Sequence, residues 1–193
     1  MSKTRQYIYL ITGLLVMSLG IALFLKSGLG ANPLTTFTNG VSLTVNISVG
    51  TASQLIMLSL LIVVFALDKS RIGIGTVING VCVGIFIDMF MKLPLEATHW
   101  SIQWILLIIA CVLFSMGLGL YVSSNLGEGT VDAFMIIIKN KCHVPIKIAR
   151  IILDMILVGL GFLLGSNIGI GTIIGMVTTG PIMNQTMKYI KKK

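Results

Sequence analysis

Long apolar runs separated by short polar connections dominate this sequence. Each run approaches the roughly 20 residues that a helix needs to cross about 30 Å of hydrocarbon. The runs span about 7–25, 49–67, 74–92, 102–122, 149–166 and 171–188. Because a helix satisfies its own backbone polar groups inside lipid, this pattern predicts an all-α integral membrane protein with six transmembrane helices.

Two shorter, semi-apolar segments at about 31–46 and 128–140 interrupt the pattern. Each follows a glycine-rich turn, in the stretches GLGANPLTTFTNGV and NLGEGTVDAFMIII. Segments of this length are too short to span a bilayer, and they occur either as re-entrant helices or as interfacial helices on the membrane surface. We expect one short helix in each segment, with both placements open.

The distribution of charge predicts an orientation. Only 10% of the residues are charged, whereas soluble domains carry about 25%. Basic residues favour the cytoplasmic ends of membrane spans, and a cytoplasmic N-terminus leaves only Lys26 and Lys92 outside. The cytoplasmic set is then Lys3, Arg5, Lys69, Arg71, Lys139, Lys141, Lys147, Arg150, Lys188, Lys191, Lys192 and Lys193. Both termini are therefore predicted to be cytoplasmic, and the net charge of +8 reflects topology rather than nucleic-acid binding.

The sequence repeats itself at a spacing of about 96 residues. SLGIALFLKSGLG at 18–30 aligns without gaps on SMGLGLYVSSNLG at 115–127. The motif IGIGT occurs unaltered at 72–76 and again at 168–172. Two matched blocks at nearly the same spacing indicate an internal duplication.

The duplication divides the chain into a first repeat at 1–98 and a second at 99–193. Each repeat contains three predicted spans, and an odd number of spans reverses the direction of the chain. We therefore predict two inverted three-helix repeats, each with its glycine-rich short helix. Inverted repeats related by an axis in the membrane plane recur among transporters.

The two glycine turns are the candidate substrate site. Glycine permits sharp turns and close approach of a ligand, and the helix start that follows presents unpaired N–H groups. Glu128 and Asp132 lie four residues apart and share one face if a helix begins at Glu128. The predicted substrate-binding residues are Asp132, Glu128, Gly127, Gly129, Thr130, Gly28, Gly30, Asn32, Thr35 and Asp154.

Structural alternatives stay open for several of these positions. Glu128 can equally be a cytosolic surface residue. Asp154 follows Arg150 by four residues and can pair with it within one helix. The IGIGT glycines need no ligand if they serve close helix packing. Asp132 is the strongest candidate, because ionisable groups inside a membrane are costly, and Thr35 is its counterpart in the first repeat.

The order of these motifs resembles a known family. A span, a glycine turn, a span, IGIGT and a further span, followed by the same order again, is similar to the YczE/YyaS/YitT group of small bacterial membrane proteins, most closely its YczE branch. That branch shows a stretch of the form GLGxGPWD. Here the first repeat has GLGANPLT, whereas the second has NLGEGTVD, which keeps Asp132 but not Pro-Trp. The resemblance implies this architecture and a bacterial cell membrane rather than a particular substrate.

This architecture favours a multi-pass transporter of a small molecule or ion, secondary or facilitative, with its substrate site between the repeats. The alternative is a membrane-embedded accessory or regulatory protein without transport activity. An enzyme is not expected, because the sequence shows no nucleophile–base pair, metal-ligand cluster or phosphate-binding loop. The expected partners are membrane lipids, an unidentified small molecule and a possible second copy in a homodimer, with no cofactor, metal or nucleic acid.

Overall fold

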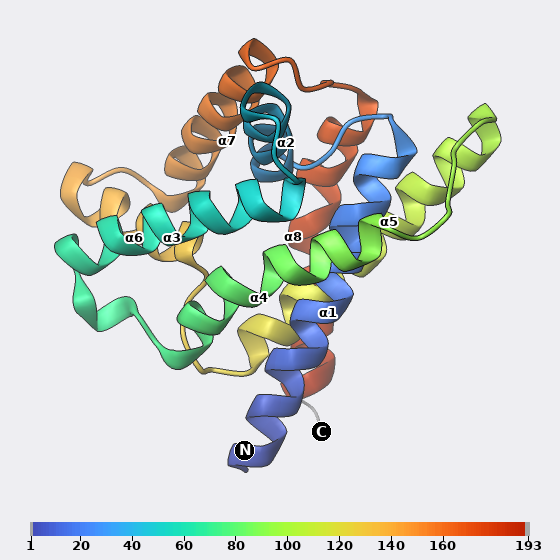
Figure 1. Cartoon of the computed structure of the whole chain (residues 1–193). Coiled ribbons are helices and arrows are strands. Elements are labelled where there is room, and N and C mark those ends of the chain that lie inside the picture. Colours follow the sequence, from blue (N-terminus) through green and yellow to red (C-terminus); the bar gives the residue numbers. More distant parts are fainter. Residues whose placement is uncertain (1, 192–193) are drawn as a thin grey trace.

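Helices make up nearly all of this protein (Figure 1). The computed structural model describes residues 2–191, apart from the side chains of Ile146, Lys147 and Lys191, so Lys192 and Lys193 of the predicted cytoplasmic set lie outside the described residues. Within 2–191 the chain forms eight α-helices and one 3-10 turn, without strands. They are α1 (Lys3–Ser27), α2 (Pro33–Val45), α3 (Val49–Leu67), η1 (Lys69–Arg71), α4 (Ile74–Met91), α5 (Trp100–Ser123), α6 (Thr130–Cys142), α7 (Ile146–Leu163) and α8 (Ile170–Lys191). The predicted all-α class is confirmed.

Local sequence signals set the starts of the first three helices. The side chains of Ser2, Asn32 and Ser48 each accept a hydrogen bond from the backbone N–H three residues further on. Such caps satisfy one of the N–H groups that a helix start leaves unpaired. Pro33 occupies the first turn of α2, where its missing N–H costs no hydrogen bond.

Residues with left-handed or otherwise positive φ recur at one spacing. Three such residues in the first half each have a counterpart 97 residues later. The pairs are Gly28 and Asn125, Gly30 and Gly127, and Asn46 and His143. The backbone therefore turns in the same way before and after α2 as it does before and after α6. The repeated sequence is matched by repeated local structure.

α1 and α5 cross at the centre of the molecule and form its most extensive helix contact (Figure 1). They run antiparallel, because Gly13 lies against Tyr121 while Gly20 lies against Phe114. α4 packs on α1 as α8 packs on α5, and α2 packs on α7 as α6 packs on α3. Each of these contacts has its counterpart when the helices of one half are exchanged for those of the other.

Three glycines make the α1–α5 crossing close. A Cβ added to Gly13 would lie 2.6 Å from the Tyr121 backbone nitrogen, and one added to Gly20 would lie 2.5 Å from that of Phe114. A Cβ on Gly117 would overlap the backbone of Met17. Lipid supplies little hydrophobic drive between helices, so small residues that let backbones approach are a main source of packing energy there.

The two halves differ at one contact. α3 packs along α4, whereas α7 and α8 make little contact in the described chain. Gly50 and Gly84 bring α3 and α4 together. Asp88, near the end of α4, accepts hydrogen bonds from the Gly50 N–H and the Ser48 hydroxyl. Gly180 is the counterpart of Gly84 in α8, and an added Cβ there would have no atom within 4 Å. One helix pair is closed and the other is open.

Exposed apolar surface marks this chain as a membrane protein. In the described residues four helices, α1, α3, α4 and α5, are long and apolar enough to cross a bilayer. α7 differs in carrying three ionisable residues, Lys147, Arg150 and Asp154, and α8 contains four threonines and two amide side chains. Large side chains such as Ile62 and Leu163 are 69% and 81% exposed, which suits lipid better than water. The number of spans stays a prediction.

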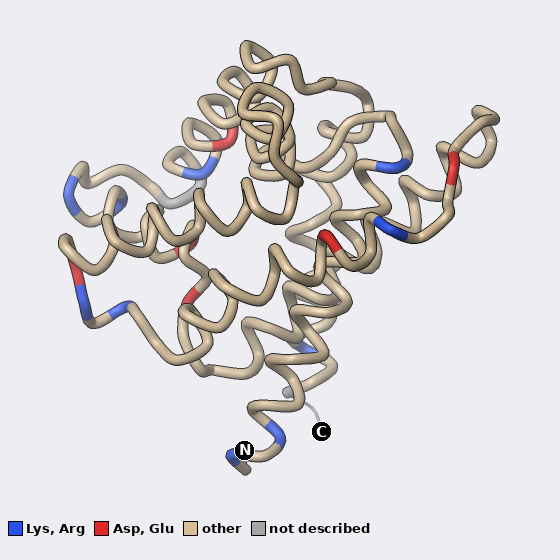
Figure 2. Tube along the Cα trace, viewed as in Figure 1, with Lys and Arg blue, Asp and Glu red and all other residues tan. Residues whose placement is uncertain are grey.

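The charged residues lie unevenly around the fold. Figure 2 shows Lys and Arg gathered near the two marked chain ends and along the left of the view. Lys26 is one of the two basic residues predicted to lie outside. Its ammonium donates a hydrogen bond to the Leu93 carbonyl at 2.9 Å, and this bond joins the end of α1 to the α4–α5 connection.

The crossing glycines predict a contrast between two substitutions. Gly117→Ala should lower stability by about 1–3 kcal/mol, because its methyl group meets backbone that cannot move aside. Gly159→Ala in α7 should be neutral or stabilising by up to about 1 kcal/mol, because an added Cβ there has open space and alanine favours a helix. Thermal unfolding of both purified variants in detergent measures the difference. Equal stability of the two variants would contradict the close crossing.

Candidate functional site

Each glycine turn is bound by the other half of the chain. The Leu126 carbonyl, in the second turn, accepts a hydrogen bond of 2.8 Å from the N–H of Gly75 at the start of α4. The Leu29 carbonyl, in the first turn, accepts one of 2.8 Å from the N–H of Gly171 at the start of α8. The IGIGT motif of each half therefore bonds the glycine turn of the other.

Glycine is required on both sides of these contacts. A Cβ on Gly73 or on Gly169 would overlap the carbonyl of the facing turn. Gly30 and Gly127 have φ values of +97° and +145°, which side chains rarely adopt, and an added Cβ on either would lie within 2.7 Å of a threonine hydroxyl. The IGIGT glycines thus have the packing role that the sequence left open.

The two IGIGT threonines differ in their partners. The Thr76 hydroxyl donates to the Glu128 carbonyl at 2.7 Å and accepts from the Gly73 N–H at 3.1 Å. Its counterpart Thr172 is also buried, but its hydroxyl has no hydrogen-bond partner among the described residues. The second glycine turn is therefore held more firmly than the first.

A group of buried polar side chains surrounds the start of α6. Asn79, Tyr121 and Thr130 come from α4, α5 and α6, and they expose 5%, 0% and 1% of their surface. The Asn79 Oδ1, the Tyr121 hydroxyl and the Thr130 hydroxyl have no hydrogen-bond partner in the described chain. Tyr121 lies beside Asn79, and its ring comes within 3.7 Å of a Cβ position on Gly129. We call these three residues the α6 polar cluster.

Sequence reasoning predicted Thr130 but missed the other two members. Asn79 interrupts a predicted span, where an amide is costly, and this was the available signal. Tyr121 ends another span and stands opposite Phe24 in the repeat alignment. A polar residue that aligns with an apolar one marks a position where the two repeats diverge.

Arg150 joins two of the predicted carboxylates. Its Nε lies 3.2 Å from Asp154 Oδ2, the intrahelical pair expected from their spacing, and its Nη1 lies 3.2 Å from Asp132 Oδ1. Asp132 is in the first turn of α6, so this guanidinium ties α6 to α7. Asp132 and Asp154 share a single positive charge.

Arg71 makes a similar bridge on the other side of the second turn. Its Nε lies 3.0 Å from Asp68 Oδ2 and its Nη1 lies 3.3 Å from Glu128 Oε1. Glu128 is 40% exposed at its side chain and is thus an ion-paired residue at the edge of the protein. Hydrogen bonds from Ser70, together with Arg71, hold the pKa of the Asp68 carboxyl below its ordinary value.

The first glycine turn and the start of α2 carry no acid. The Asn32 Oδ1 accepts from the Thr35 N–H at 3.1 Å and caps α2, while the Asn32 amide nitrogen has no partner among the described residues. Thr35 is 3% exposed. Gly28 ends α1 with φ of 68° and has open space around it.

The predicted residues therefore form two groups. α2 and α6 make no extensive contact in the described chain, so Asn32 and Thr35 lie apart from Asp132 and its neighbours. The second group holds the charge, since Glu128, Asp132 and Asp154 all belong to it.

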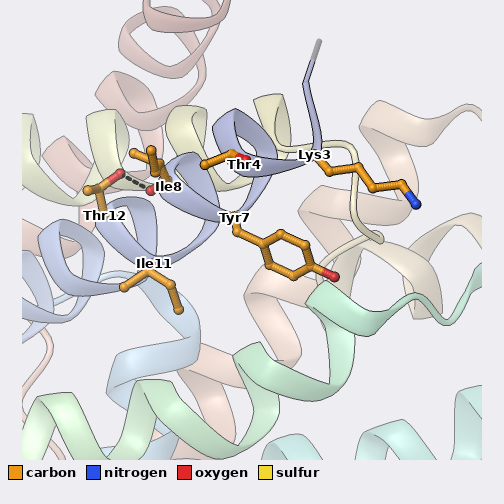
Figure 3. Close-up of a pocket in the computed structure, with 6 residues that line it drawn as sticks. All are labelled: Lys3, Thr4, Tyr7, Ile8, Ile11 and Thr12. Carbon is orange, nitrogen blue, oxygen red and sulfur yellow. Dashed lines mark hydrogen bonds between the residues drawn. The ribbon is translucent and has the colours of Figure 1, made fainter.

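A surface hollow of about 600 Å³ lies away from both groups (Figure 3). It is lined by Lys3, Thr4, Tyr7, Ile8, Ile11 and Thr12, all from the start of α1. The Thr12 hydroxyl is already bonded to the Ile8 carbonyl at 2.6 Å. This hollow is the open side of one helix, and none of the predicted site residues lines it.

The two threonines predict opposite responses to the same substitution. Thr76→Val should destabilise the protein by about 1–3 kcal/mol, because it leaves the half-buried Glu128 carbonyl and Gly73 N–H without their partner. Thr172→Val should leave stability unchanged or raise it, because it removes a hydroxyl that has no partner. Chemical or thermal unfolding in detergent compares the variants. Equal destabilisation by both would show that the Thr172 hydroxyl is bonded in solution.

Comparison with known proteins adds a family. The model of a family described as a family of unknown function, DUF6198, matches residues 4–188. An uncharacterized protein of Haemophilus influenzae is 30% identical over 183 residues, which cover 95% of this chain and 84% of the relative. The uncharacterized protein YyaS of Bacillus subtilis is 26% identical over 190 residues, covering 97% and 94% of the two chains. No solved structure matches.

A further relative supports the membrane assignment. The uncharacterized membrane protein YczE of Bacillus subtilis is 30% identical over 182 residues, covering 92% of this chain and 83% of YczE. The predicted resemblance to the YczE and YyaS proteins is confirmed. With its glycine turns, its IGIGT motifs and nearly its whole length included in the match, this chain belongs to the DUF6198 family.

Proposed function

We propose that this protein is a multi-pass transporter of a small molecule or ion, built from two inverted repeats in a bacterial cell membrane. The observation that carries the proposal is the reciprocal bonding of the two glycine turns, in which each half completes the non-helical backbone of the other. Transporters of inverted-repeat design place their substrate sites at such interrupted segments.

The inverted arrangement is supported by the pairing of helices. α1 and α5 hold corresponding positions in the two sequence repeats and cross in antiparallel directions. Corresponding helices of a duplicated chain would run parallel if the repeats had the same orientation. The paired positive-φ residues support the same assignment.

The contacts of α2 favour a re-entrant helix over an interfacial one. A Cβ on Gly40 of α2 would lie 2.7 Å from the Gly161 carbonyl of α7, and the Asn39 amide donates to the Ser166 hydroxyl at 3.0 Å. Thr36 and Thr38 of α2 are buried. Polar side chains and irregular backbone at membrane depth need this kind of cover from protein.

The lack of close packing between α7 and α8 in the described chain is consistent with alternating access. The α3–α4 pair is closed in the described chain, whereas its counterpart is not. If the repeats exchange these roles, the path opens first to one side of the membrane and then to the other. Gly180 is then the glycine that lets α7 approach α8 in the second state, as Gly84 does for α3 and α4.

Transport without a nucleotide fits this chain. The sequence has no GxxxxGK[ST] motif, so the driving force would come from a gradient or from a partner subunit. The rival function, an accessory or regulatory membrane protein, needs no substrate and predicts no response of stability to any solute.

Cysteine labelling tests the predicted topology. In a Cys142→Ser background, a membrane-impermeant maleimide added to intact cells should label Thr98→Cys, because the α4–α5 connection is predicted to be outside. It should label Lys69→Cys only after permeabilisation. The native exposed Cys142 serves as a second cytoplasmic reporter in the parent protein. Labelling of positions 69 and 98 from the same side would contradict the inverted repeats.

Substrate binding and flux test the transport function. A thermal-shift screen of the purified protein against metabolite pools should find a solute that raises its midpoint of unfolding, because ligands that bind the folded state stabilise it. Asp132→Asn should reduce flux of that solute into proteoliposomes at least about tenfold while the protein stays folded, if Asp132 contacts the substrate or a proton. Asp154→Asn should act mainly on stability, since it removes a partner of Arg150.

The outcome that contradicts this function is also defined. A folded protein that responds to no pool and moves no solute supports the accessory role. A second contrary outcome is that Asp132→Asn keeps its flux while a stable Asp154→Asn variant loses it. The assignment of flux to Asp132 and of stability to Asp154 would then be wrong.

A further inference from the structure

The α6 polar cluster brings buried oxygen atoms from three helices to the surroundings of the start of α6. The Asn79 Oδ1 can only accept, and the hydroxyls of Tyr121 and Thr130 can accept as well as donate. All three residues are more than nine-tenths buried. A molecule that offers donors or positive charge can bind these oxygens, which have no hydrogen-bond partner in the described residues.

Asp132 adds a carboxylate oxygen to this place. Its Oδ1 is held by Arg150, whereas its Oδ2 makes no hydrogen bond within the described residues. That Oδ2 lies 3.0 Å from a Cβ position on Gly129, and the Tyr121 ring lies 3.7 Å from the same position. The free carboxylate oxygen thus faces the turn that the tyrosine also faces.

The ion pairs around the second turn hold more carboxylates than guanidinium groups. Arg150 is shared by Asp132 and Asp154, and Arg71 is shared by Asp68 and Glu128. The four carboxylates outnumber the two guanidinium groups. A place lined by one excess sign concentrates ligands of the opposite sign, and oxygen ligands suit hard cations.

We propose that the α6 polar cluster, together with Asp132, binds a small monovalent cation, either an alkali ion or an ammonium-type ion. An ammonium group donates its hydrogen atoms to the oxygens that lack partners, and an alkali ion is coordinated by them. This inference deepens the proposed function and rests on it only for the step of moving the bound cation across the membrane. Binding is measured separately.

The equivalent place at the first glycine turn does not share this chemistry. In the repeat alignment Phe24 corresponds to Tyr121, Gly175 to Asn79 and Thr35 to Asp132. Phe24 is fully buried, and an added Cβ on Gly175 would lie 3.4 Å from its ring, so these positions are filled by apolar contacts. The cation site is therefore confined to the second glycine turn.

The two halves supply matched variants for the test. Tyr121→Phe and Asp132→Thr each install the residue that the fold already accommodates at the equivalent place in the first half. Both variants are therefore expected to fold, and a third variant, Asn79→Ala, removes the remaining acceptor. Thr172→Val, at the other glycine turn, is the control that should not affect cation binding.

The experiment is thermal unfolding of the full-length protein in detergent, at constant ionic strength, in chloride salts of sodium, potassium, methylammonium and the bulky cation N-methyl-D-glucamine. A small cation should raise the midpoint of thermal unfolding by about 2–4 °C relative to the bulky cation. This is the shift expected when binding raises the folding equilibrium constant several-fold in a chain of this size. The shift should be absent in Tyr121→Phe and Asp132→Thr, and kept in Thr172→Val. Methylammonium as the active salt identifies an ammonium-type ligand, and sodium or potassium identifies an alkali ion.

Three results would overturn the cation site. The first is equal stability of the parent protein in all four salts. The second is an unchanged cation shift in both Tyr121→Phe and Asp132→Thr. The third is a response that follows the anion when chloride is replaced by gluconate.

Uptake into proteoliposomes separates this inference from the proposed function. Stabilisation by a cation without its uptake keeps the cation site and counts against transport of that ion. Uptake of a different solute, without any cation response, keeps the transporter and overturns the cation site.

Discussion

The hydrogen bond between each glycine turn and the opposite half is the contact on which the arrangement depends. Backbone that leaves a helix loses its internal hydrogen-bond partners, and where protein covers it the partners must come from elsewhere in the protein. At 2.8 Å in both places, the Gly75 and Gly171 N–H groups supply these partners from the other half. The requirement fixes the positions of α4 and α8 relative to the turns. It also explains why both faces of the contact are glycine, since any Cβ would hold the backbones apart.

The same need for close backbone approach governs the centre of the fold. Between two lipid-exposed helices the gain from burying apolar surface is small, so packing and short contacts decide which helices associate. The glycines of α1 and α5 permit the central crossing, and the aromatic pair of Phe24 and Phe114 packs edge to face beside it, with ring centroids 6.1 Å apart. Glycine thus serves two purposes here, turning the chain at its interruptions and joining helices between them.

Local patterns in the sequence located the helices, the glycine turns and the repeated motifs, because hydrophobic run length and turn chemistry are local properties. The pairing of Arg150 with Asp154 was also predictable, since four residues span one helical turn. The bond from Arg150 to Asp132 was not, because it depends on how α6 and α7 pack. For the same reason the two glycine turns were predicted to form one site. In the structure each turn is bonded by the opposite half, and the polar neighbours of the two turns are separate. Tyr121 was not predicted as a site residue, because a tyrosine at the end of a span commonly lies at the membrane interface without a further role.

The ion pairs around the second turn contribute more to charge and geometry than to stability. Exposed pairs typically contribute only about 0–1 kcal/mol, and the Arg150 side chain is 43% exposed. Yet each arginine bridges separate elements: Arg150 links α6 to α7, and Arg71 links the α3–α4 connection to the second turn. Arg150 pairs with Asp132 at the start of α6, and Arg71 pairs with Glu128 just before it. Each arginine is shared by two carboxylates, so one negative charge is left in excess at each arginine. The first turn has neither bridge and no acid, so the duplicated backbone supports two chemically different surroundings. In the proposed transporter, a scaffold with one charged and one neutral turn would give a solute different environments on the two halves of its path.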